Sequence, residues 1–230
     1  MEILHNGFTL QLCKGAFPLS TDSVALAGFV KLPKNAKILD LGAGCGTLGL
    51  LLCAKDENCS VLGVEIDPNA HETALQNAES NHISDRLRSI CADVKTADIP
   101  VGHFQVCVSN PPYFAGGPVS QSHAVARQED TLTLDVLFRQ AARALQYGGD
   151  FYLVHRPERL AEICALGSRY QLEPKRLQLL RHRADGPVSL ILLHCRKGGK
   201  PGLIWEEESL HHPDGTPSDY YKSLYHLQEV

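Results

Sequence analysis

The sequence contains no Cys-x-x-Cys pair and no cysteine–histidine set at zinc spacing, although it has eight cysteines. With a net charge of −4, it has no overall positive field that would attract a polyanion. No apolar run reaches membrane-spanning length, and the start, MEILHNGFTL, lacks the cationic and apolar regions of a secretory signal. Cys53, Cys91, Cys107 and Cys195 lie inside apolar runs, where we expect small buried side chains in a reducing compartment. These features predict a cytoplasmic protein without a zinc site.

The 230 residues are enough for one sizeable core, and short apolar runs alternate with helix-like segments. Asp67 and Pro68 have the residue types of a helix N-cap and first helical position, and Gly148–Gly149 follow a helical pattern that they are expected to close. Such alternation predicts a mostly parallel sheet with helices on both faces. The predicted strands are 36–42, 60–66, 87–93, 104–110 and 150–155, then a hairpin of 176–182 and 188–196; helices are expected at 47–55, after 67, at 131–145 and at 156–167.

A glycine-rich loop follows the first predicted strand, in ILDLGAGCGTLG (38–49). It contains a formal GxGxxG, so a dinucleotide site is one reading. Asp40 argues against it, because an anion at the end of this strand would repel a pyrophosphate but suits a ligand with a positive charge, such as the amino group of S-adenosylmethionine. Glu65 ends the second strand and could accept hydrogen bonds from a ribose diol, and Asp93 follows the third and could accept from an adenine amine.

The fourth predicted strand ends abruptly in VSNPPYF (108–114), where an amide, two rigid residues and two aromatic rings follow a buried run. Proline fixes its own φ and biases the preceding residue to an extended conformation, so the carbonyl groups here are aimed in advance. Taken alone, Pro-Pro could merely stiffen a loop. After a glycine loop and spaced acids, a catalytic role is favoured.

These motifs, in this order and spacing, resemble the class I S-adenosylmethionine-dependent methyltransferases, in particular the amino-methylating branch marked by Asn/Asp-Pro-Pro-Tyr/Phe. The similarity to bacterial tRNA adenine-N6 methyltransferases extends to GAFPLSTDSVALAGFV (15–30), ARQE (126–129) and DGTPSDYYKSLYH (214–226). It departs from them at Gln128, where relatives often have His. The resemblance implies a Rossmann-like class I methyltransferase fold: a seven-stranded, mostly parallel sheet with an antiparallel C-terminal hairpin and helices on both faces. It also implies one domain over 1–230, with 1–30 as an N-terminal extension carrying a cofactor and substrate lid, 36–196 as the core sheet and 197–230 as a C-terminal tail.

The same resemblance implies the roles of individual residues. In the family, the side-chain carbonyl of the Asn110 position and the backbone carbonyl of the Pro111 position accept the two protons of a planar amine, so that its lone pair can attack the methyl carbon. Catalytic positions are Asn110, Pro111, Pro112 and Tyr113; cofactor-binding positions are Phe17, Asp22, Asp40, Gly42, Gly44, Gly46, Glu65, Ile66, Asp93, Val94 and Asn110; substrate-binding positions are Tyr113, Phe114 and Arg127. Tyr113 would stack on an extruded base.

Three further groups of residues allow either a functional or a purely structural interpretation. Phe17, Asp22 and Ser23 could close over the methionine end of the cofactor, or form a helix cap and a core ring. Arg127 and Glu129 could contact substrate or form an exposed ion pair. A cationic cluster near the hairpin could contact RNA phosphates or be a solvated edge; its members are Arg169, Lys175, Arg176, Arg181, Arg183, Arg196, Lys197 and Lys200.

We therefore expect an S-adenosylmethionine-dependent N-methyltransferase that acts on the exocyclic amine of an RNA adenine, in a tRNA near the anticodon, without a metal. One alternative keeps the chemistry and changes the acceptor to a protein glutamine amide or a ribosomal RNA guanine amine. Alternatives of other classes are a dinucleotide-binding oxidoreductase and a non-catalytic RNA-binding relative.

Overall fold

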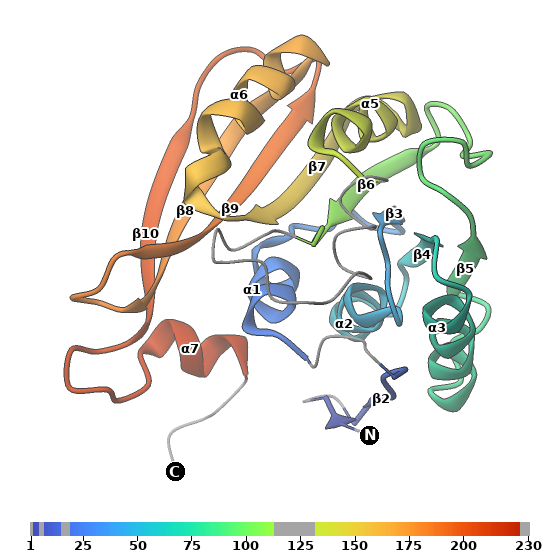
Figure 1. Cartoon of the computed structure of the whole chain (residues 1–230), viewed down its shortest axis with the longest axis horizontal. Helices are drawn as coiled ribbons and strands as arrows, with labels where there is room; N and C mark the ends of the chain where they lie inside the picture. Colours follow the sequence, from blue (N-terminus) through green and yellow to red (C-terminus); the bar gives the residue numbers. More distant parts are fainter. Residues whose placement is uncertain (1, 5–6, 15–18, 113–131, 226–230) are drawn as a thin grey trace.

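The computed structural model describes residues 2–4, 7–14, 19–112 and 132–225. A central sheet crosses the molecule and has helices on both faces (Figure 1). Its strands are β3 (Lys37–Leu41), β4 (Ser60–Glu65), β5 (Leu87–Cys91), β6 (Phe104–Ser109), β7 (Leu145–His155), β8 (Leu172–Arg183), β9 (Val188–Lys197) and β10 (Ile204–His211); a small separate sheet pairs β1 (Glu2–Ile3) with β2 (Thr9–Leu10). The helices are α1 (Thr21–Phe29), α2 (Thr47–Lys55), α3 (Pro68–Ser80), α5 (Leu134–Ala144), α6 (Leu160–Arg169) and α7 (Asp219–Leu224), with a 3-10 turn at Pro157–Arg159.

The strand order across the main sheet is β10-β8-β9-β7-β6-β3-β4-β5. The strands from β3 to β7 pair in parallel, and β9 lies antiparallel between β7 and β8. This arrangement confirms the seven predicted strands, the C-terminal hairpin and the Rossmann-like class. The sheet also has an eighth strand, β10, which pairs in parallel with β8.

Two apolar cores lie on opposite faces of the sheet, because successive side chains of a strand point in opposite directions. Val106 and Val108 of β6 belong to the core between the sheet and helices α1 and α2. Cys107, between them in the sequence, belongs to the core between the sheet and helices α5 and α6. Figure 1 shows α1, α2 and α3 below the sheet and α5 and α6 above it. Burial on both faces explains why these strands read as continuous apolar runs.

Local signals explain several boundaries. Asp67 caps α3 by accepting from the N–H of Asn69 at 2.8 Å, with Pro68 as the first helical residue, as predicted. The prediction that Gly148–Gly149 close a helix was wrong: α5 ends at Ala144, and the chain enters β7 at once. Gly148, with φ of 77°, lies where the β6–β7 register shifts, so it serves an irregularity inside a strand.

The segment after Lys197 contains regular structure that the sequence pattern did not indicate. β10 begins with exposed residues and carries the acidic run Glu206–Glu208, so it lacks the apolar alternation of a half-buried strand. Its acidic side chains form ion pairs with arginines of β8. Arg176 Nη2 lies 3.3 Å from Glu206 Oε2, and Arg181 Nη2 lies 3.2 Å from Glu207 Oε2.

Candidate active site

The glycine loop and Asn110 emerge side by side at the point where strand order reverses. The chain forms β4 and β5 on one side of β3 before it returns to form β6 on the other. Such a switch point opens a crevice beyond the carboxyl ends of the strands, where open parallel sheets bind ligands. Asp40 pairs in register with Val108, and the Ser109 hydroxyl donates to the Leu41 carbonyl at 2.7 Å. The ends of β3 and β6 are thus held together directly below the predicted site.

The three predicted loop glycines all have left-handed backbones: φ is 77° at Gly42, 55° at Gly44 and 80° at Gly46. A β-carbon on Gly46 would lie 3.2 Å from the β-carbon of Ala74, so this glycine lets α3 approach the loop. A β-carbon on Gly44 would meet no atom within 4 Å among the described residues. Gly44 therefore leaves open space above the loop backbone, as a ligand-binding loop requires.

Asp40 is buried without a partner. Asp40 is 1% exposed, and neither of its carboxyl oxygens has a hydrogen-bond partner in the described part of the chain. Burial, with a smaller contribution from the Glu65 carboxylate, raises the pKa of Asp40 to about 8. A buried carboxyl without a partner fits a ligand that carries hydrogen-bond donors and positive charge, because such a ligand would stabilise the ionised form.

Glu65 is built into the glycine loop. It is 6% exposed, and its two carboxylate oxygens accept from the N–H of Gly44 and of Asp67, each at 2.8 Å. Each oxygen keeps a further lone pair, because an ionised carboxylate can accept about four hydrogen bonds. Glu65 thus fixes the loop from the end of the neighbouring strand and stays next to Gly44.

The residues after β4 and β5 lie on the same edge of the sheet. Ile66 is 40% exposed, which is unusual for a large apolar side chain directly after a core strand. Asp93 accepts from the N–H of Lys95 at 2.8 Å, and Val94 is buried. The N–H of Ala92 donates to the Glu65 carbonyl at 2.8 Å and joins the two strand ends. An exposed apolar side chain directly after Glu65, on the sheet edge that also carries Asp93, suits the flat face and polar edge of an adenosine.

Asn110 is oriented by a residue far away in the sequence. Its side-chain Nδ2 donates to the hydroxyl oxygen of Ser23 in α1 at 3.0 Å. Ser20, not Ser23, is the N-cap of α1, and its hydroxyl accepts from the N–H of Ser23. Sequence reasoning placed Ser23 near the cofactor or in a cap and missed this contact.

The structure describes some of the remaining predicted site residues but not others. Pro111 is buried and Pro112 is half-buried, directly after Asn110. Phe17, Tyr113, Phe114, Arg127 and Glu129 lie outside the described residues. The predicted stacking and substrate contacts therefore remain predictions.

Asp22 faces a cation that sequence reasoning did not single out. Burial raises the pKa of Asp22, and the charge of Arg156 opposes that shift. Arg156 directly follows β7, the neighbour of β6, and donates to the Ser189 carbonyl at 3.1 Å. A charged residue at the carboxyl end of a core strand was the available signal, since Asp40 and Glu65 were identified by their places near strand ends.

The N-terminal segment is attached to the glycine loop through α3. Asn77 accepts from the N–H of Gln11 at 2.8 Å and donates to the Gln11 and Cys45 carbonyls, and Asn81 exchanges two hydrogen bonds with Thr9. The Sγ atoms of Cys13 and Cys45 then lie 3.6 Å apart. Asn77 in α3 and Asn81 at its C-cap were a possible sequence signal, because a spacing of four residues puts both on one side of the helix.

All eight cysteines are free, but Cys91 is exposed, which corrects its prediction as a buried side chain. Cys53, Cys107 and Cys195 are buried as predicted. In the described ranges, no group of three or more His, Cys, Asp or Glu residues could hold a metal ion. None of the helices that the structure describes is long and apolar enough to cross a membrane.

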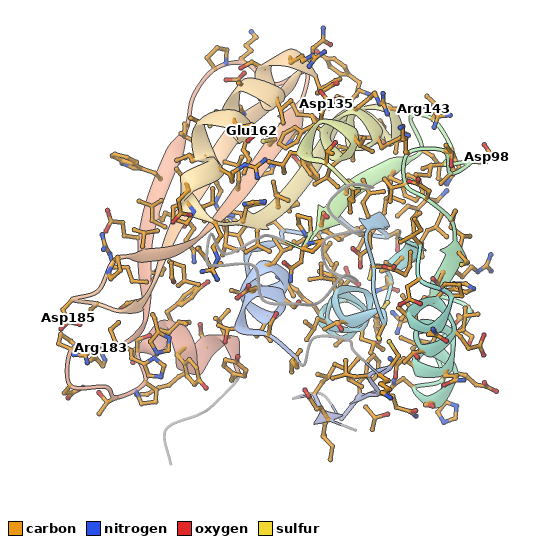
Figure 2. All side chains as sticks on the ribbon, viewed as in Figure 1. Asp98, Asp135, Arg143, Glu162, Arg183 and Asp185 are labelled. Atoms are coloured by element: carbon orange, nitrogen blue, oxygen red, sulfur yellow. The ribbon has the colours of Figure 1, made fainter. Side chains whose placement is uncertain are left out.

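The arginines of the predicted cationic cluster are matched by acids, whereas Lys175 and Lys197 donate to backbone carbonyl groups. The arginines pair with carboxylates: Arg169 with Asp135, Arg176 with Glu206, Arg181 with Glu207, Arg183 with Asp185 and Arg196 with Asp150, at 3.0–3.4 Å. Figure 2 shows Arg183 and Asp185 at lower left, at the turn between β8 and β9. Because these positive charges have negative neighbours, the cluster by itself does not support an RNA surface.

A family model described as the methyltransferase small domain matches residues 20–164. A tRNA1(Val) (adenine(37)-N6)-methyltransferase of Dickeya chrysanthemi is 34% identical over 189 residues, which cover 80% of this chain and 75% of that protein. The protein of the same name from Photobacterium profundum is 28% identical over 212 residues, covering 90% and 88%.

Among solved structures, a predicted O-methyltransferase from Agrobacterium tumefaciens is similar with a TM-score of 0.76 and 23% identity, covering 90% of this chain and 96% of that one. The geranyl diphosphate C-methyltransferase of Streptomyces coelicolor, solved with S-adenosyl-L-homocysteine, has a TM-score of 0.55 and 13% identity, covering 76% and 79%. At these identities, the likeness to the two structures concerns the fold.

Proposed function

The chain belongs to the methyltransferase small domain family, and on that premise we propose that it transfers a methyl group from S-adenosylmethionine to the N6 amine of an adenine in tRNA. The proposed base is adenine 37, beside the anticodon, which is the base in the names of the relatives. A tRNA acceptor also supports a cytoplasmic location. The single observation that carries the chemistry is Asn110, held by its amide nitrogen directly after β6, next to the switch point of the sheet.

The cofactor site is proposed to lie over the glycine loop. Asp40 would receive the positively charged end of the cofactor, Glu65 its ribose and Asp93 the amine of its adenine, with Ile66 and Val94 against the base. Gly42, Gly44 and Gly46 would form the floor, and Asp22 would lie near the methionine end. Support comes from the partnerless carboxyl of Asp40 and the open space over Gly44. The N-terminal segment, in contact with the loop at Cys45, is proposed as one wall.

The proposed catalytic step depends on acceptors rather than on a strong base. S-adenosylmethionine supplies an activated methyl group on a sulfonium. An adenine amine is a poor nucleophile because its lone pair is delocalised into the ring. Asn110 and the Pro111 carbonyl would draw its two protons aside and favour the pyramidal nitrogen of the transition state. Each 1.4 kcal/mol or so of such stabilisation gives about tenfold in rate.

The test is an acceptor competition with labelled S-adenosylmethionine, using tRNA, ribosomal particles and peptide release factors. We expect label in tRNA, and N6-methyladenosine after digestion to nucleosides. Asn110→Ala should lower kcat by at least about a hundredfold while the Kd for S-adenosylmethionine changes less than about threefold, because the side chain acts on the amine. Asn110→Asp, which keeps an acceptor oxygen, is the matched control and should retain more activity. Label only in protein or ribosomal RNA would overturn the proposed acceptor.

A further inference from the structure

Ser23 lies between the cap of α1 and the side chain proposed to act on the substrate. It is 7% exposed and lies in the first turn of α1, whereas Asn110 follows β6, 87 residues later. The Ser23 hydroxyl oxygen accepts from Asn110 Nδ2 at 3.0 Å and from the Ser20 hydroxyl at 3.4 Å. A hydroxyl oxygen has two lone pairs, so these two donors occupy its acceptor capacity.

The polarity of this contact matters because a side-chain amide has two ends of nearly equal size and opposite chemistry. The carbonyl end accepts a proton from an amine, whereas the NH₂ end can only donate and would repel the amine hydrogens. A rotation of about 180° around the last side-chain bond exchanges the two ends, and this torsion is soft. In this structure the Ser23 hydroxyl accepts from the NH₂ end, so the carbonyl end of the same amide points away from Ser23.

We propose that Ser23 is a positioning residue: its hydroxyl oxygen holds the NH₂ end of Asn110 and thereby turns the carbonyl oxygen of the same amide towards the acceptor amine. This inference rests on the proposed function, because it concerns the same reaction. Ser23 does not touch the acceptor in this proposal. It acts by favouring the amide rotamer in which the NH₂ end faces α1.

The surroundings of Ser23 supply the rigidity that such a role needs. Lys55 Nζ donates to the carbonyl groups of Ala27, Gly28 and Val30, at 2.9, 3.1 and 2.6 Å, and fixes the end of α1 to α2. At the other end of α1, the hydroxyl groups of Thr21 and Tyr225 lie 3.4 Å apart. A side chain on a helix held at both ends can orient its partner to within the small tolerance of a catalytic group.

A purely structural role for Ser23 is the competing explanation, and Asn110→Asp separates the two. A carboxylate has two equivalent oxygens, so its rotation by about 180° changes nothing, and Ser23 has no orientation to select. If Ser23 only packs α1, its removal should cost the same in both backgrounds. If it orients the amide, its removal should matter only with Asn at position 110.

The experiment measures kcat, KM and cofactor Kd with the tRNA acceptor for Ser23→Ala, Asn110→Asp and the double variant. We expect Ser23→Ala to lower kcat about tenfold with the cofactor Kd within about twofold, and to change kcat less than about twofold in the Asn110→Asp background. Ser23→Thr, which keeps the hydroxyl, should restore most of the lost kcat. Thr73→Ala is the control: it removes another buried helix hydroxyl, which donates to the Asn69 carbonyl at 2.8 Å, and should leave kcat unchanged.

Equal losses in both backgrounds, or no loss of kcat in Ser23→Ala, would overturn the positioning role. Failure of the proposed function has a different signature, since the unmodified protein would then methylate no tRNA adenine. If it methylates another planar amine instead, the same four proteins are compared on that acceptor. The double-variant comparison then decides the role of Ser23 in the same way.

Discussion

Asp40 illustrates at the scale of one residue how a proposed binding residue can oppose stability. Its carboxyl is fully enclosed, has no hydrogen-bond partner among the described residues and lies near Glu65. These conditions disfavour the ionised form, which explains why its pKa rises to about 8 from an ordinary value of 3.8. A cationic ligand would reverse this penalty. The residue is therefore costly without ligand and useful with it.

Asp40→Asn should stabilise the ligand-free protein, and increasingly so as pH rises. Between pH 3.8 and about 8 the folded state holds a proton that the unfolded state has lost, so stability of the unmodified protein falls with rising pH through that window. Asparagine at position 40 does not titrate, so it removes this dependence of stability on pH. Melting temperatures of both proteins from pH 5 to 9 check it: the advantage of Asp40→Asn should grow towards pH 8. Its Kd for S-adenosylmethionine should rise at least about tenfold, and parallel melting curves would contradict the assignment.

At the scale of one element, the glycines of the loop between β3 and α2 define the proposed cofactor site. Gly44 and Gly215 provide a matched pair: φ is 55° and 88°, and a β-carbon on either would meet nothing within 4 Å in the described structure. Alanine at both positions should impose the same kind of backbone strain, about 1–2 kcal/mol. Only Gly44 lies over the proposed cofactor site, so the two substitutions differ in what the new methyl group faces.

Gly44→Ala should therefore weaken S-adenosylmethionine binding by about tenfold or more, whereas Gly215→Ala should leave the Kd within about twofold. Both should lower the melting temperature by a similar amount, because both strain a left-handed residue. Calorimetric titration and thermal melting of the two variants check this. Equal Kd values for S-adenosylmethionine in the two variants would contradict the placement of this loop in the cofactor site.

At the scale of the whole molecule, the C-terminal segment supports the helix that carries Ser23. Leu224 of α7 is buried and packs against α1: a β-carbon on Gly28 would lie 2.6 Å from its Cδ2. β10 holds this segment to the sheet edge through β8, and Gln178 of β8 donates to the Tyr220 hydroxyl at 2.6 Å. A segment expected to be a tail thus braces the N-terminal side of the site (Figure 1).

Leu224→Ala should lower the free energy of unfolding by about 2–3 kcal/mol, because it leaves a cavity between α7 and α1. Amide hydrogen exchange should become faster in α1 before it does in β3 or β6. Val101→Ala is the control, since Val101 is 66% exposed, and it should change stability by less than about 0.5 kcal/mol. Unchanged exchange in α1 would mean that α7 does not brace it.

The sequence alone was sufficient for features that depend on residues close together along the chain. Continuous apolar runs indicated the doubly covered strands, Asp67–Pro68 marked the start of α3, and the glycines after the first predicted strand marked the loop between β3 and α2. β10 escaped this reasoning because its acidic side chains find their partners only across the sheet. Two of these acids, Glu206 and Glu207, also neutralise two arginines of the cationic cluster near the hairpin.

What only the tertiary structure decided is which distant groups meet. Asn110 could be recognised by its neighbours Pro111 and Pro112, but its contact with Ser23 depends on how α1 packs beside the end of β6. Residue type and spacing specify the local backbone conformation and the chemical groups that are available, because they act over a few neighbouring residues. Orientation and charge compensation arise between segments far apart in the chain, and no local pattern encodes them.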